Sequence, residues 1–278
     1  MSQIISNIVP ANNFPPTNSK SWLVRVYSKT KKYKLLVSIE IIIACALLFL
    51  ISQIVGIYAV GLFGEYFHHF QGIQAVNWLN NDIFSQFWYV FIAEGLLVLM
   101  VFKILRIFKK DRNFIGLNNF KLVYILYAVG LYVVFIISAT FIINGLHSLI
   151  PALNTSQAQQ IGFSNPTTSL QKIATFLSLV ILAPIAEEIL FRGLLFESLK
   201  RNIGLVWSAA LSCLIFAGAH LWEGGSSGLF IVGALDILIL SVFLIFLKIK
   251  TKSLYPGILL HMTNNFISFL YLYIIIKK

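Results

Sequence analysis

The feature that most constrains this chain is a series of apolar runs, each long enough to form a helix that crosses a lipid bilayer. Such a helix needs roughly 17–25 mostly apolar residues. The sequence predicts seven of them, at 35–58, 84–102, 122–143, 173–197, 204–222, 229–247 and 254–276. We therefore expect an all-α polytopic membrane protein with seven, or at most eight, transmembrane helices.

The composition excludes most other classes of protein. Of the 278 residues, 58% are hydrophobic and only 11% are charged, and the mean hydropathy is +0.85. A soluble domain usually has about 25% charged residues. These values rule out an ordinary cytosolic enzyme, a disordered tail and a nucleic-acid binder. The two cysteines, Cys45 and Cys213, lie inside apolar runs, so no disulfide framework is expected.

The net charge of +11 comes from Lys and Arg residues that gather in alternate connections. These connections are the segment before residue 35, the segment 103–121, residues 200–201 and the segment 248–252. The intervening connections lack Lys and Arg until Lys172, and Lys277 and Lys278 are further exceptions at the C-terminus. This is the positive-inside pattern, and it places the N-terminus in the cytoplasm.

Three ionisable residues interrupt the fourth apolar run, at Glu187, Glu188 and Arg192. A charged side chain at the centre of a membrane helix costs about 2.5–3.5 kcal/mol, so such residues are functional candidates by default. Glu188 and Arg192 are four residues apart and can pair on one helix face. Glu187 points about 100° away from Glu188 by helix geometry.

Polar residues of the same kind occur at His220, near the end of the fifth run, and at His261 and Asn265 in the seventh. At 1.5 Å per residue, Glu187, His220 and His261 lie roughly 15, 24 and 11 Å from the basic ends of their runs. These depths permit an intramembrane active site but do not require the side chains to meet.

Two chemistries suit this set of residues. Glu187, His220 and His261 could hold a divalent metal such as zinc, which would activate a water molecule. Without a metal, Glu187 and His220 could position and deprotonate the water while His261 and Asn265 stabilise the oxyanion.

The three patterns Glu187-Glu188-x-x-x-Arg192, Phe216-x-x-x-His220 and His261-x-x-x-Asn265 resemble the signature motifs of the CPBP/Abi intramembrane metalloproteases. This family includes the type II CAAX prenyl endopeptidases and bacterial proteins linked to bacteriocin processing or self-immunity. The resemblance covers roughly residues 170–270, in the same order and with fitting spacing.

The resemblance implies an active site inside the membrane that is open toward the cytoplasm. It implies that Glu187 is the water-activating base and His220 its partner or a metal ligand. His261 and Asn265 would be a ligand and an oxyanion stabiliser, with Glu188 and Arg192 in support. The implied partners are the bilayer and a hydrophobic or lipidated peptide substrate, in a bacterial plasma membrane.

We accordingly divide the chain into a basic cytoplasmic segment, N-terminal transmembrane helices and a CPBP/Abi-like catalytic core, at 1–34, 35–165 and 166–278. A non-proteolytic bacteriocin-immunity or scaffold protein and a proton-coupled transporter remain alternatives, because intramembrane carboxylates and histidines also form proton relays. Two further carboxylates, Glu94 and Asp236, could connect helices or line the cavity, and we favour the first role.

Overall fold

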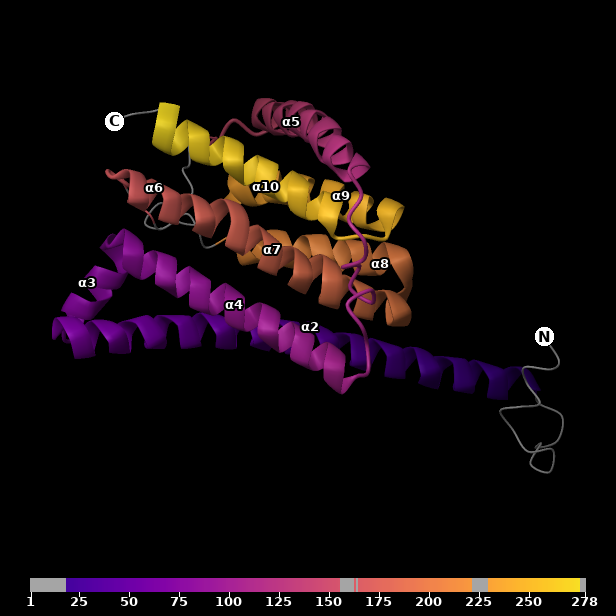
Figure 1. Ribbon diagram of the computed structural model, residues 1–278. Coiled ribbons are helices and arrows are strands. Elements are labelled where there is room, and N and C mark those ends of the chain that lie inside the picture. Colours follow the sequence, from indigo (N-terminus) through magenta and orange to yellow (C-terminus); the bar gives the residue numbers. More distant parts are fainter. Residues whose placement is uncertain (1–18, 156–162, 164, 222–229, 276–278) are drawn as a thin grey trace.

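The structure, a computed structural model, describes residues 19–155, 163, 165–221 and 230–275, with side chains from residue 33 onward. Every regular element within these ranges is a helix (Figure 1). This confirms the all-α class. The first 18 residues of the expected basic segment 1–34 lie outside the described residues.

Five helical stretches among the described residues are long and apolar enough to cross a membrane, which confirms the expected kind of protein. They are Tyr33–His68, Val123–Leu149, Ser169–Ala219, Ile231–Thr251 and Tyr255–Ile275. The third stretch has 51 residues and contains the expected span 173–197 and most of the expected span 204–222. The run expected at 84–102 forms helix α4, Ile83–Ile107, which is not one of the five. The count of seven crossings therefore stays a prediction.

Helix α2, Ser19–His68, packs along α4, and the short helix α3, Ile73–Asn81, joins them (Figure 1). Gln53 of α2 donates a hydrogen bond to Glu94 of α4 at 3.2 Å and accepts one from the Tyr89 hydroxyl. The helices approach closely at Gly56, where an added Cβ would lie 3.0 Å from the Cβ of Ala93. Glu94 therefore connects two helices, as expected.

The stretch from Ser169 to Ala219 is a chain of five helical segments. Helices α6 (Ser169–Phe176), α7 (Ala183–Glu188) and α8 (Phe196–Ala219) alternate with the π-helices η1 (Leu177–Leu182) and η2 (Ile189–Leu195). A capping box between Thr168 and Gln171 starts α6, since each satisfies a backbone N–H of the other. The direction changes at Gly204, whose φ of 80° is accessible to glycine but strained for other residues. This break separates the two expected spans.

The last part of the bundle consists of α5 (Val123–Leu149), α9 (Ile231–Thr251), α10 (Tyr255–Leu270) and the π-helix η4 (Tyr271–Ile275), and α5, α9 and α10 contact one another. Lys and Arg gather in and beside the connections that join α4 to α5 and α9 to α10. We call this end of the bundle, on the right in Figure 1, the basic end, and the opposite end the basic-poor end.

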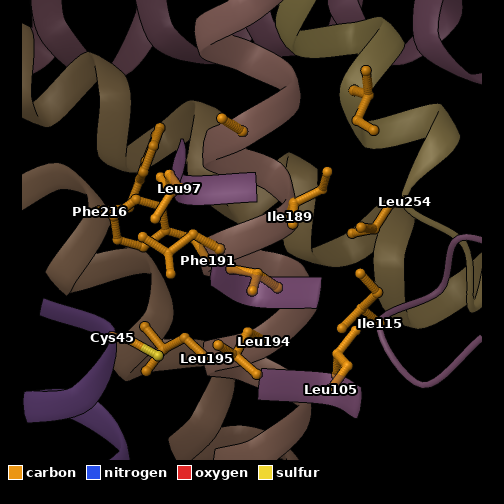
Figure 2. Close-up of a cluster of buried hydrophobic side chains, with 14 of the residues drawn as sticks. Cys45, Leu97, Leu105, Ile115, Ile189, Phe191, Leu194, Leu195, Phe216 and Leu254 are labelled. Carbon is orange, nitrogen blue, oxygen red and sulfur yellow. The ribbon is translucent and has the colours of Figure 1, made fainter. Parts of the chain in front are cut away.

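The connection between α4 and α5 folds inward and closes the basic end. Ile115 is fully buried there, and an added Cβ at Gly193 would lie only 3.1 Å from the Cβ of Ile115. Two hydrogen bonds fix the connection: Leu254 N–H donates to Gly116 O at 2.9 Å, and Lys248 Nζ donates to Ile115 O at 2.7 Å. Figure 2 shows Ile115 beside Leu105 and Leu254 within the largest apolar cluster.

Candidate active site

A buried ion pair between Glu188 and Arg192 supports the other side chains of the site. Arg192 Nη1 donates to Glu188 Oε1 at 2.8 Å, and both side chains are fully buried, as the four-residue spacing predicts. Arg192 Nη2 also donates to the hydroxyl of Ser241 on α9 at 2.6 Å. The guanidinium lies 4.1 Å from the ring centre of Phe216, a cation–π contact. Buried charges are stable only when paired and hydrogen-bonded in this way.

His261 on α10 lies between the two adjacent carboxylates of α7. Its Nδ1 is 3.2 Å from Glu188 Oε1, and its Nε2 is 3.6 Å from Glu187 Oε2. A carboxylate that accepts a hydrogen bond from Nδ1 fixes the orientation of the ring and leaves Nε2 directed at the other carboxylate. Glu188 is thereby connected to both Arg192 and His261.

His220 is held at the C-terminal end of α8. Its Nδ1 lies 2.8 Å from the carbonyl oxygen of Phe216, one turn earlier. A carbonyl only accepts hydrogen bonds, so this contact places a proton on Nδ1 and directs Nε2 away from the helix. The Phe216 ring packs against both histidine rings, with centroid distances of 4.8 Å to His220 and 5.8 Å to His261.

Asn265 is fixed by a π-helical segment. Its Nδ2 donates to the carbonyl oxygen of Leu179 in η1 at 2.9 Å, and its Oδ1 accepts from Asn264 Nδ2 at 3.4 Å. The wider turn of a π-helix interrupts regular α-helical bonding, and such segments are frequent at functional sites. The first Asn265 N–H is used by Leu179, and its second N–H remains as a hydrogen-bond donor, because an amide nitrogen carries two hydrogens.

The four side chains Glu187, His220, His261 and Asn265 line one cavity of about 310 Å³. The four side chains therefore share a cavity although the depths expected from the sequence differ. Asp236 of α9 lines the same cavity, which is the alternative that the sequence left open for it and not the role we favoured. Glu188 and Arg192 do not line the cavity but lie directly behind it.

The cavity is acidic. Glu187 and Asp236 are its carboxylates, and no Lys or Arg occurs among the lining residues that the structure describes. Complementarity of charge therefore favours neutral or cationic peptide segments over a free carboxylate.

Sequence reasoning missed Ser241 and gave Phe216 no role beyond its motif. The signal for Ser241 is weak, because a single hydroxyl in an apolar run is common and its partner lies 49 residues away in the sequence. The importance of Phe216 depends on its contacts with His261 and Arg192, which exist only after α8, α10 and η2 pack together.

The predicted metal ligands do not form a coordination group in this arrangement. No set of three His, Cys, Asp or Glu side chains in the described part of the chain lies close enough together to hold a metal ion. This holds for Glu187, His220 and His261, although they share a cavity. We therefore derive no chemical step through a metal, and metal binding stays a prediction.

One comparison with known proteins gives a match. Residues 169–267 match the family described as type II CAAX prenyl endopeptidase Rce1-like. The matched range includes all six predicted site residues and lies within the expected catalytic core. No curated protein and no solved structure matches the chain significantly.

Proposed function

We propose that this chain is an intramembrane endopeptidase of the Rce1-like type II CAAX prenyl endopeptidase family, which residues 169–267 match. Its substrate would be a hydrophobic, lipidated or membrane-associated peptide. The observation that carries the proposal is that Glu187, His220, His261 and Asn265, from three separate helices, line one cavity. The location that we propose is a bacterial plasma membrane with the N-terminus in the cytoplasm, supported by the distribution of basic residues.

In the proposed reaction Glu187 is the general base. Its carboxylate, together with His220, holds a water molecule in the cavity and takes a proton from it as the water oxygen attacks the peptide carbonyl carbon. The same carboxyl group then gives that proton to the leaving amine nitrogen as the C–N bond breaks. The products are a carboxylate and an amine, and no covalent enzyme intermediate is needed.

The negative charge that develops on the carbonyl oxygen requires hydrogen-bond donors. Asn265 offers its second amide N–H, and His261 offers Nε2–H when both of its ring nitrogens carry a proton. Glu188 and Arg192 act through His261, because the buried pair fixes the ring from behind. We propose these two as positioning residues.

The decisive experiment uses the purified full-length protein in liposomes with a membrane-inserted peptide library that includes a farnesylated CAAX peptide. Mass spectrometry identifies any new peptide termini. Glu187→Gln should abolish cleavage, since the amide cannot accept the proton. The matched control is Glu94→Gln, which changes the same functional group at the α2–α4 contact outside the cavity and should leave cleavage intact.

The outcomes separate the candidate functions. Cleavage that persists in Glu187→Gln would refute the proposed base. If the variant with Glu187, His220 and His261 all replaced still protects cells from a membrane-active peptide, the chain is instead an immunity or scaffold protein. Proton-linked flux in the same liposomes, lost in Glu187→Gln, would indicate a transporter.

The predicted divalent metal is tested separately by elemental analysis of the purified protein. Stoichiometric zinc that disappears in His261→Ala would support metal binding at this site. A metal-free protein that cleaves with a chelator present would contradict it.

A further inference from the structure

The cavity extends from the catalytic candidates in one direction only. Helix α10 begins at the basic end, and the cavity-lining residues that follow His261 include Asn265 and Ser268 on α10 and Leu272 on η4. At 1.5 Å per residue, Leu272 lies roughly 16 Å beyond His261 toward the basic-poor end. On the neighbouring helices, Leu179 and Phe230 extend the lining toward the same end.

The opposite direction is closed by packed side chains. Between the Glu188–Arg192 pair and the basic end lie Leu195, Ile115 and Leu254, each at most 1% exposed. Figure 2 shows these residues in the apolar cluster. Among the described residues, this close packing separates the site from the basic end.

The two ends of the bundle also differ in charge. The connections at 103–121, 200–201 and 248–252 belong to the basic end. Lys172, at the start of α6, is the exception at the opposite end within the described residues, and the sequence adds Lys277 and Lys278 after η4. Short connections rich in Lys and Arg remain in the cytoplasm, so the basic end faces the cytoplasm.

From these observations we infer that the site receives its peptide from the non-cytoplasmic face of the membrane. The substrate class is then a peptide segment that is exposed at, or inserted from, that face. This is opposite to the cytoplasmic opening that the motif resemblance implies. The inference rests on the proposed function for its substrate, but the direction of access is measurable without any cleavage.

The first test measures water access with engineered cysteines in the full-length protein. Cys45 and Cys213, both buried, are replaced by Ala, and either Ser268→Cys or Asn119→Cys is added. Ser268 lines the cavity, whereas Asn119 is exposed in the connection at the basic end. In intact cells, a membrane-impermeant maleimide should label Ser268→Cys, and it should label Asn119→Cys only after permeabilisation. The reverse pattern would overturn the inference.

A second measurement decides the case if the cavity cysteine is unreactive under both conditions. Two membrane-anchored reporter peptides carry the same cleavable segment, one on each side of the membrane. Cleavage of the non-cytoplasmic reporter supports the inference, and cleavage of the cytoplasmic reporter alone refutes it. If neither reporter is cleaved while the maleimide labels Ser268→Cys from outside, the proposed protease function fails but the direction of access stands.

Discussion

Removal of the arginine from the buried ion pair is the sharpest test of what stabilises this site. In Arg192→Met the carboxylate of Glu188 keeps its charge but loses a partner at 2.8 Å, and only His261 remains beside it. Breaking a buried pair by removing one partner costs about 3–5 kcal/mol. We expect the free energy of unfolding to fall by an amount in this range.

The double variant shows whether the unpaired buried charge causes the loss of stability. Glu188→Gln with Arg192→Met removes both charges and keeps an acceptor for His261. The two single variants should therefore cost more in sum than the double variant, with a coupling near the upper end of the ~0.5–3 kcal/mol seen for contacting residues. The partly exposed pair of Lys200 with Glu197, at 2.5 Å, offers a control, because Lys248 remains beside Glu197 when Lys200 is replaced. Lys200→Met should cost only about 0–1 kcal/mol.

The assay is reversible unfolding of the purified protein in mixed micelles by increasing fractions of denaturing detergent. The fluorescence of the five tryptophans reports the transition. A loss below about 1 kcal/mol in Arg192→Met, the value typical of exposed pairs, would refute the reasoning. So would strict additivity in the double variant.

Three further predictions follow from single contacts. Ser241→Ala removes the hydroxyl that accepts from Arg192 at 2.6 Å, and it should lower the unfolding free energy in the same assay by about 1.5–3 kcal/mol. Gly116 has a φ of 86°, and an added Cβ would clash with Lys248 Nζ, so Gly116→Ala should lower the free energy of unfolding by about 1–3 kcal/mol. Asp236→Lys reverses a charge in the cavity and should shift cleavage from Lys-containing toward Glu-containing members of a matched peptide pair, measured by mass spectrometry.

Two of these variants have a control or an outcome that would contradict the prediction. For glycine the control is Gly61→Ala, where an added Cβ meets nothing within 4 Å. Equal stabilities of the Gly61 and Gly116 variants would show that the connection at the basic end is not held as described. An unchanged peptide preference in Asp236→Lys would show that this carboxylate does not face the bound peptide.

Local sequence patterns determined much of this protein. Run length indicated the helices, because a bilayer-crossing helix needs a fixed number of apolar residues. The four-residue spacing predicted the ion pair of Glu188 with Arg192, since both residues belong to consecutive turns of one stretch. The order of three short motifs was enough to indicate the family that residues 169–267 match.

Only the tertiary structure decided which polar residues meet and on which side of them the cavity lies. Hydropathy cannot distinguish a helix face that contacts lipid from one that contacts another helix, because both are apolar. The pairing of Arg192 with Ser241, the place of Asp236 in the cavity and the burial of Ile115 beneath Gly193 each join residues far apart in the sequence. Such contacts depend on the offset and close approach of packed helices, and no local pattern in the chain encodes them.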